Sequence, residues 1–301
     1  LYHFATDYQR ETFLKPLLEG TARSCFSMTE PEVAGSDPTL IQTTAVQDGD
    51  DWVINGHKWF TSGAKGADFA IVIAKTDPDA SVAQARNSAF IVPLDSPGFE
   101  IVRDVETMGG KHNHPEVRYN DVRVPKENLL GERGGGHKLG QVRLGPARLA
   151  HCMRWLGQIE MALEMLIDRA QKRFAHGSLL SEKQSIQWMM SDSAMELYSS
   201  KLMVLHAAYK IENGMEFKQE VSMAKHHVAN TLWRVVDRAM QVHGALGYST
   251  DTPLAGMMQQ ARWARLADGA DEVHQMRIAE LLMKAYNSDG SINQGVGGLP
   301  L

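Results

Sequence analysis

FSMTEPEVAGSD (residues 26–37) and WFTSG (residues 59–63) are the two stretches that decide the fold of this 301-residue chain. Each brings hydroxyl side chains, a glycine and backbone donors together within a few residues. Such a pair could hold a planar polar ring and then a phosphate, because glycine lets backbone N–H groups approach a phosphate closely. Two ordinary turns at strand ends would give the same pattern, so spacing alone leaves both interpretations open.

The composition is that of a globular protein, with 43% hydrophobic and 22% charged residues. The net charge of −5 argues against nucleic-acid binding, which usually needs a basic excess. No run approaches the ~20 apolar residues that cross a bilayer, and no histidine or cysteine spacing matches a metal site. Cys25 and Cys152 lie far apart in the sequence, which favours a reducing compartment. We therefore expect no metal, no nucleic acid and no membrane span.

Hydrophobic patterning predicts a β-domain over residues 24–132, made of short apolar strands with a hairpin turn at Asn55-Gly56. Over residues 133–287 the period becomes helical. The segments predicted as helices are 138–175, 180–212, 216–243 and 254–285, the last interrupted at Asp268-Gly269.

The predicted fold class is therefore α+β, with a central β-barrel-like domain followed by an antiparallel four-helix bundle. Residues 1–23 are interpreted as the remnant of an N-terminal helical domain, so that the chain would be a piece of a longer protein. Residues 288–301 are expected to form a loose tail.

Three further motifs have two interpretations each. QVHGALGY (residues 241–248) ends a helix, where backbone amides could meet a pyrophosphate or Gly244 could simply cap the helix. In DGADE (residues 268–272), Asp268 could be a helix N-cap or a general base at a helix start. GERGGGHK (residues 131–138) lacks the Lys and Ser/Thr that a phosphate loop needs, and we interpret it as a linker.

Taken together, these segments resemble the acyl-CoA dehydrogenase family from about residue 8 to residue 285. The resemblance depends on blocks that occur in the right order: MTEP (28–31) with GSD (35–37), NGHKWFTSG (55–63), DVRVP (121–125) with NLLG (128–131), Arg173 with Gly177 and Gln184, QVHGALGY, and the Asp-Gly segment at 268. An inserted Glu32, RLGPAR (143–148) and DGADEVH (268–274) are similar to one branch, whose animal members carry a phosphotransferase-like domain ahead of the dehydrogenase.

The resemblance implies FAD as the cofactor and assigns roles to particular residues. Those expected to line the isoalloxazine ring are Phe26, Met28, Thr29, Trp59 and Thr61. Gly35 and Ser36 would reach the pyrophosphate or the thioester arm, and Arg173 and Gln184 of a neighbouring subunit would hold the rest of FAD together with Gln241 and Gly244. Ser36, Arg148 and Gly269 would contact the acyl-CoA, and Asp268 would be the catalytic base.

The implied activity is α,β-dehydrogenation of a fatty acyl-CoA thioester to the trans-2-enoyl-CoA. A carboxylate would remove the α-proton, the β-hydride would pass to the flavin, and the electrons would go on to an electron-transferring flavoprotein. A homodimer or homotetramer with a shared FAD site is implied as well. The compartment would be the cytoplasm in a bacterium and the mitochondrion or peroxisome in a eukaryote.

Two residues depart from the family pattern. Most members use glutamate as the base, whereas Asp268 is one methylene, about 1.5 Å, shorter. Relatives that place the base on the first bundle helix have it where this chain has Ala147, and Ala245 stands where a second glycine is common. Because an aspartate base also occurs in flavin oxidases that act on nitroalkanes, such an oxidase is an alternative, and so is a non-catalytic scaffold.

Overall fold

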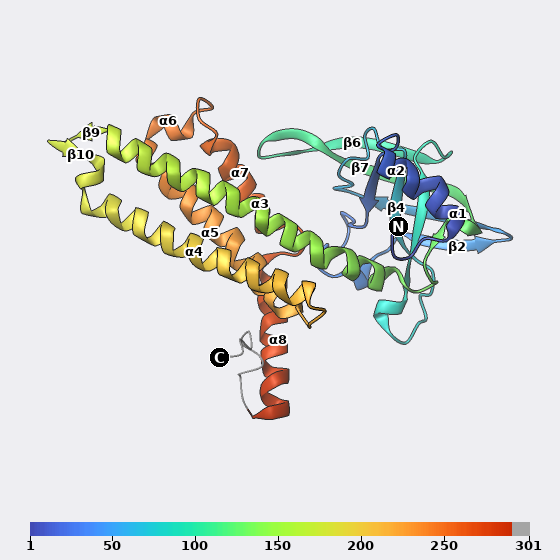
Figure 1. Cartoon of the computed structure of the whole chain (residues 1–301). Coiled ribbons are helices and arrows are strands. Elements are labelled where there is room, and N and C mark those ends of the chain that lie inside the picture. The colour runs from blue at the N-terminus through green and yellow to red at the C-terminus, as the bar shows by residue number, and fades with distance from the viewer. Residues whose placement is uncertain (291–301) are drawn as a thin grey trace. The chain divides into compact units, whose positions relative to one another are not determined.

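The computed structural model describes residues 1–290, so the predicted tail falls outside the described residues from position 291 on. The chain forms two compact units, Leu1–Arg143 and Leu144–Leu301, which are described separately (Figure 1).

The first unit is built on an eight-stranded mixed sheet in the order β6-β7-β3-β2-β4-β5-β8, with β1 parallel to β4. Among the described residues no pairing joins β6 to β8, and β8 has only two residues with which to extend a ladder. The α+β class is confirmed, and the barrel-like expectation is corrected to an open sheet. The strands are β1 (Ser24–Ser27), β2 (Thr44–Asp48), β3 (Asp51–Lys58), β4 (Phe69–Lys75), β5 (Asn87–Pro93), β6 (Phe99–Thr107), β7 (Gly110–Pro125) and β8 (Leu129–Leu130).

A short N-terminal helix packs on this sheet. It consists of α1 (Asp7–Gln9), a π-helical turn (Arg10–Leu14) and α2 (Lys15–Glu19). The Phe13 ring meets Phe69 of β4 edge-on, with ring centroids 5.1 Å apart. This contact buries the apolar side of the helix against the sheet.

The predicted hairpin at Asn55-Gly56 is wrong. Strand β3 runs through both residues and pairs with β2 on one side and β7 on the other, with an irregularity between Ile54 and Gly56. The turn lies earlier, at Gly49 between β2 and β3, where φ is +64°. Gly56 is needed for another reason, because a Cβ there would lie 2.2 Å from Thr43 Oγ1.

The second unit is a helical bundle whose predicted helices are confirmed to within a few residues at most ends. Its core is formed by side chains of α3, α4, α5 and α7, which lie side by side in Figure 1. Arg238 of α5 bonds Ser193 of α4, and Ser200 of α4 bonds Thr231 of α5, so these two helices are antiparallel. The helices are α3 (Gly136–Lys172), α4 (Gln184–Glu212), α5 (Lys218–His243), α6 (Ala245–Tyr248), α7 (Leu254–Ala264) and α8 (Asp271–Asp289), and the hairpin β9 (Phe174–Ala175)–β10 (Ser178–Leu179) joins α3 to α4.

The interruption predicted at Asp268-Gly269 is confirmed and separates α7 from α8. Asp268 has φ +51° and Gly269 has φ +109°, which lie outside the helical region and stop α7 from continuing. After this turn α8 leaves in a different direction from α7 (Figure 1). In the part of the chain that is described, no helix is long and apolar enough to cross a membrane.

Candidate active site

The two sequence stretches that suggested a binding site lie against each other in the first unit. Trp59 N–H donates to the Thr29 carbonyl at 3.1 Å, and Thr29 Oγ1 donates to the Trp59 carbonyl at 2.9 Å. Thr61 follows on the same segment, where its hydroxyl lies 3.3 Å from Ser27 Oγ. These bonds bring the end of the first stretch and the second stretch side by side, while the cofactor roles assigned to their residues stay predictions.

A buried ion pair that the sequence analysis missed fixes this arrangement. Lys58 is fully buried and donates to the Met28 carbonyl at 2.7 Å and to Glu30 Oε1 at 3.0 Å. Glu30 also accepts from Gln42 N–H at 2.7 Å and from Thr43 N–H and Oγ1 at 2.9 and 2.6 Å. The one signal for this ion pair in the sequence was a lysine inside an alternating strand pattern. Lysine is almost never buried unless it is paired, so a lysine on the inward face of a strand indicates a partner.

The pKa shifts of this pair follow from its burial. Burial lowers the pKa of Lys58 to about 8, and the attraction of Glu30 only partly offsets this effect. Burial by itself would raise the pKa of Glu30, but Lys58 and the bonds from Thr43 and Gln42 outweigh it and lower the pKa. Both groups are therefore charged at neutral pH, and they hold the two stretches together.

The aromatic residues of the second stretch form the surface on which a planar ring could lie. Trp59 and Phe60 meet at 69° with ring centroids 5.0 Å apart, and Phe60 is 42% exposed. Phe60 has φ +48°, a strained conformation that the neighbouring hydrogen bonds maintain. Thr29 lies beside this aromatic surface, but its hydroxyl already donates to the Trp59 carbonyl, so its contact with a flavin ring stays a prediction.

The loop with Gly35 and Ser36 folds back over Thr29. A Cβ at Gly35 would lie 3.2 Å from Thr29 Cγ2, so a glycine suits this close approach. His57 anchors the loop by bonding Glu32 through Nδ1 at 2.5 Å and Glu116 through Nε2 at 2.9 Å. The space beneath the loop measures about 10 Å³, room for one water at most.

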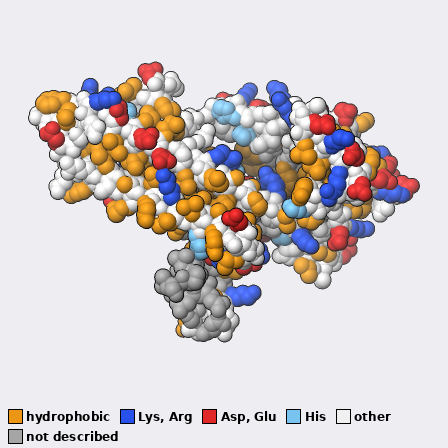
Figure 2. All heavy atoms as spheres, in the orientation of Figure 1, with side chains coloured by type: hydrophobic (Ala, Val, Ile, Leu, Met, Phe, Trp, Pro, Cys, Tyr) orange, Lys and Arg blue, Asp and Glu red, His pale blue; other side chains and the backbone are white. Residues whose placement is uncertain are grey.

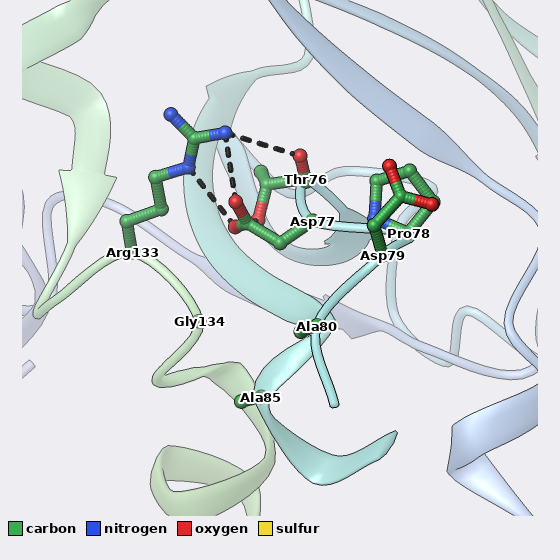
Figure 3. A pocket seen from close by; sticks show the side chains of 8 residues that line it. All are labelled: Thr76, Asp77, Pro78, Asp79, Ala80, Ala85, Arg133 and Gly134. Atoms are coloured by element: carbon green, nitrogen blue, oxygen red, sulfur yellow. Dashed lines mark hydrogen bonds and ion pairs between the residues drawn. The ribbon is translucent and has the colours of Figure 1, made fainter. Parts of the chain in front are cut away.

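A larger cavity elsewhere in the first unit contains none of the predicted site residues. It has a volume of about 600 Å³, and the ion pair between Arg133 and Asp77, 2.8 Å long, closes one side of it (Figure 3). The side-chain bond from Arg133 lowers the pKa of Asp77, which keeps the pair ionised. Because the two charges on that wall satisfy each other, we do not assign it a role. The lining residues are Thr76, Asp77, Pro78, Asp79, Ala80, Ala85, Arg133 and Gly134.

In the second unit, four predicted cofactor residues lie at one end of the bundle. Arg173 follows α3 directly and Gln184 begins α4, while Gln241 and Gly244 end α5. The bond between Arg238 and Ser193 places the end of α5 beside the start of α4. All four residues are exposed. Gly244 caps α5 through its N–H, which bonds the carbonyls of Met240 and Gln241, so the C-cap interpretation is correct for its backbone.

The predicted catalytic segment lies on α5 and the first half of α3. Arg148 Nε donates to the Asp268 carbonyl at 2.7 Å, and Lys225 Nζ donates to the Gly269 carbonyl at 2.6 Å. His151 Nε2 lies 3.0 Å from Asp268 Oδ2. Two cations thus hold the backbone of the segment, and a histidine contacts its carboxylate.

Burial affects both of these cations. It lowers the pKa of Arg148, although Asp268 opposes the shift, and it lowers the pKa of Lys225 to about 8. Neither cation is moved far enough to lose its charge at neutral pH. Arg148 thus binds the backbone of the predicted catalytic segment, and its contact with CoA stays a prediction.

The N-cap interpretation of Asp268 is wrong. The N-cap of α8 is Ala270, with φ −62° and ψ 159° and no side-chain capping bond. Asp271, in the first turn of α8, is held by Arg265 at 2.7 Å and Asn230 at 3.0 Å. Asp271 thus carries a negative charge in the first turn of α8, and neither aspartate caps the helix.

Sequence analysis missed three residues around this segment: His151, Lys225 and His274. His151 is three positions after Arg148 and so shares its helix face, which is a signal that could have been used. His274 is 2% exposed, and a Cβ at Gly269 would lie 2.9 Å from its Nε2. Burial, reinforced by Lys225 and Arg148, lowers the pKa of His274 to about 4, so it is neutral at physiological pH.

Two family models match the chain: the acyl-CoA dehydrogenase middle domain over residues 25–122, and the acyl-CoA dehydrogenase C-terminal domain over residues 134–283. The chain belongs to the acyl-CoA dehydrogenase family. It is thus a member of a family of FAD-dependent oxidoreductases, and FAD is the cofactor that its residues must fit.

Similar proteins support this assignment. "Probable acyl-CoA dehydrogenase FadE2" of Mycobacterium tuberculosis is 45% identical, and the match covers 93% of this chain and 70% of that protein. Mouse "Acyl-CoA dehydrogenase family member 10" is 41% identical over 94% of this chain but only 27% of its own length. Because animal family members 10 and 11 are among the relatives, the predicted branch is confirmed.

Solved structures agree with the fold. The acyl-CoA dehydrogenase of Geobacillus kaustophilus has a TM-score of 0.88 and 30% identity, covering 93% of this chain and 73% of that chain. Butyryl-CoA dehydrogenase of Megasphaera elsdenii has a TM-score of 0.84 and 33% identity, covering 91% and 72%.

Proposed function

We propose that the protein catalyses α,β-dehydrogenation of a fatty acyl-CoA thioester to the trans-2-enoyl-CoA and passes the electrons to an electron-transferring flavoprotein. One observation carries this proposal: Asp268 lies in a strained turn whose backbone is held by Arg148 and Lys225. A general base must be positioned before its pKa matters, and this turn is held from two helices.

In the proposed reaction the Asp268 carboxylate takes the α-proton of the thioester. When bound, FAD would supply the acceptor for the β-hydrogen, which leaves as a hydride. The substrate thus loses the α-hydrogen as a proton and the β-hydrogen together with two electrons. The polar edge at Thr29 and the aromatic surface of Trp59 and Phe60 would hold the ring. We assign the backbone at Gly269 to the thioester carbonyl, where a donor would stabilise the negative charge that develops as the proton leaves.

We further propose that the FAD site is shared between two copies of the chain. Arg148 and Lys172 are separated by 24 positions on α3 (172 − 148), which is about 36 Å along a helix. A single FAD molecule is shorter than this distance. The group Arg173, Gln184, Gln241 and Gly244 would therefore serve the site of another subunit, as a homodimer or homotetramer allows.

The surface of α4 supports association. Six large apolar side chains on it are at least 50% exposed, at spacings of three, four or seven residues that place them along one side of the helix. Hydrophobic side chains gather along the bundle in Figure 2. The six are Trp188, Met195, Tyr198, Leu202, Leu205 and Tyr209.

A second candidate function is a flavin oxidase of the nitroalkane type, and the observation that favours it is an aspartate at the base position. The same carboxylate would take the proton next to a nitro group, and turnover would consume oxygen.

Anaerobic titration of the full-length FAD-loaded protein separates these functions. A panel of acyl-CoAs of different chain length and branching is added while the visible absorbance of the oxidised flavin is recorded. The proposal expects bleaching by at least one acyl-CoA and electron transfer from that sample to an electron-transferring flavoprotein. Bleaching by nitroalkanes alone, with oxygen uptake in air, would establish the oxidase instead. Protein that binds no FAD would support the scaffold alternative.

A further inference from the structure

The loop that carries Asp268 is closed at its two ends by a pair of residues, Arg265 and Asp271. Arg265 is the C-cap of α7 and Asp271 is the first residue of α8, so residues 266–270 form the loop between them. Arg265 Nε donates to Asp271 Oδ2 at 2.7 Å, and Asp271 N–H donates to the Arg265 carbonyl at 3.1 Å. A side-chain bond and a main-chain bond thus join the same two residues, and we call this pair the clasp.

Helix α5 fixes the Asp271 side of the clasp. Asn230 Nδ2 donates to Asp271 Oδ2 at 3.0 Å and to the His226 carbonyl at 2.9 Å. His226 Nδ1 lies 3.5 Å from Asp271 Oδ1, and Asp271 is only 3% exposed. Burial by itself would raise the pKa of Asp271, but the bonds from Arg265 and Asn230 outweigh it and lower the pKa. The clasp is therefore an ionised pair that is anchored in the bundle.

The loop that the clasp closes has an unfavourable backbone conformation. Asp268 has φ +51° and Gly269 has φ +109°, and left-handed backbone is uncommon for a residue other than glycine. Such a conformation persists only where the surrounding structure holds it. Arg148 and Lys225 bond the carbonyls of Asp268 and Gly269, at 2.7 and 2.6 Å, and so hold the middle of the loop. The clasp adds a different constraint, because it fixes where the loop starts and where it ends.

We propose that Arg265 and Asp271 are positioning residues for the reaction, because their clasp keeps the loop in the conformation that presents Asp268 and Gly269 to the substrate. This inference rests on the proposed function of Asp268 as the base. The two side chains bond each other and act on Asp268 through the main chain. Joining the ends of a short loop removes much of its conformational freedom, and a reacting group held in place reacts faster than one that drifts.

Variants of Arg265 separate positioning from support of the fold. Arg265→Met removes the side-chain bond at a position whose side chain is 35% exposed, whereas Arg265→Lys keeps a cation for Asp271. The proposal expects flavin reduction by acyl-CoA under anaerobic conditions to slow by roughly 10- to 100-fold in Arg265→Met and to recover most of its rate in Arg265→Lys. FAD content and the Kd of acyl-CoA should stay close to those of the wild type. Glu272→Gln is the matched control, since this exposed carboxylate lies in the same first turn of α8, and it should keep the wild-type rate.

A loss of stability without a loss of rate would overturn the proposal. If Arg265→Met has a lower Tm but its folded, FAD-loaded form is reduced at the wild-type rate, the clasp supports the fold and nothing more. Asp271→Asn keeps the size of the side chain and removes its charge, so it serves as the second variant where Arg265→Met does not fold. The same slow reduction is expected of it.

Amide hydrogen exchange followed by mass spectrometry tests the loop without turnover. Peptides that cover residues 265–271 should exchange faster in Arg265→Met than in the wild type or in Glu272→Gln, while peptides from the middle of α5 keep their protection. Equal exchange of the loop in all three proteins would contradict the proposal. If wild-type flavin is bleached by acyl-CoA and Arg265→Met matches it, only this inference fails; if wild-type flavin is not bleached, the proposed function fails.

Discussion

Glu30 in the first unit and Asp268 in the second are both carboxylates beside a buried lysine, yet the lysines hold them in opposite ways. Lys58 bonds the carboxylate of Glu30 itself, at 3.0 Å. Lys225 bonds a backbone carbonyl next to Asp268, at 2.6 Å, whereas the Asp268 carboxylate lies 3.0 Å from His151 Nε2. Burial lowers the pKa of both lysines to about 8, so the two cations are alike while their targets differ.

This difference separates a structural carboxylate from the carboxylate that we propose as the base. Both oxygens of Glu30 accept bonds from its own fold, through Lys58, Thr43 and Gln42. Such a group is fixed but has little capacity left for a substrate proton. Asp268 is instead held through its main chain, where Arg148 bonds its own carbonyl and Lys225 bonds that of Gly269.

The largest expected effect is that of Lys58→Met. Removing one partner of a buried ion pair leaves the other charge uncompensated, so we expect the free energy of unfolding to fall by about 3–5 kcal/mol. Urea denaturation followed by tryptophan fluorescence measures this loss. Lys65→Met at an exposed position is the matched control and should change stability by less than about 0.5 kcal/mol. Equal effects of the two variants would show that the pair does not hold the first unit.

The next effect is a pH dependence at His274, which has no counterpart beside Glu30. Its pKa is about 4 in the folded protein against 6.5 for a free histidine, so below pH 6.5 the unfolded chain binds a proton that the folded chain does not. Its contribution to stability is therefore complete above pH 6.5 and falls by up to about 3 kcal/mol toward pH 4. The difference in unfolding free energy between wild type and His274→Gln should change over this range. If this difference in unfolding free energy stayed constant between pH 7 and pH 4, the prediction would be wrong.

Lys225→Met should cost less than Lys58→Met, about 1.5–3 kcal/mol, because its bond goes to a neutral carbonyl. It should also slow flavin reduction by acyl-CoA, since the turn at Gly269 loses one of its two cations. Stopped-flow reduction and urea denaturation of the same sample measure both quantities. A loss of stability as large as that of Lys58→Met would erase the contrast between the two lysines.

The smallest effect is expected for Glu32→Gln, which weakens the contact with His57 on the loop of Gly35 and Ser36. Glu32 is 48% exposed, so the change should cost less than about 1 kcal/mol. His57 keeps its bond to Glu116, which is itself held by Arg103 at 2.7 Å. Thermal denaturation should therefore show a small shift in Tm, and a shift as large as that of Lys58→Met would be unexpected.

The sequence was most informative about elements that local pattern determines. The helical period predicted the long bundle helices, and Asp268-Gly269 marked their interruption, because left-handed backbone cannot continue a helix. The hairpin at Asn55-Gly56 was predicted wrongly because glycine there serves a close approach by Thr43 rather than a positive φ. Composition and periodicity cannot separate these two uses of glycine.

Contacts between distant positions could not be predicted from the sequence, because local patterns do not pair residues that are far apart in the chain. Lys58 and Glu30 are 28 positions apart, and His151 and Asp268 are 117 apart, so no local pattern pairs them. The candidate FAD residues came from the family resemblance and stay predictions; of the expected ring group, the structure joins Thr29 to Trp59 by a hydrogen bond.

The central claim is that Asp268 is the base, and Asp268→Asn tests it most directly. The asparagine is nearly the same size and keeps the backbone carbonyl that Arg148 holds, but it cannot accept the α-proton. We predict that this variant binds FAD as the wild type does and that dithionite still reduces it. Acyl-CoA should then fail to bleach the flavin under anaerobic conditions. Bleaching at a rate close to that of the wild type would contradict the account.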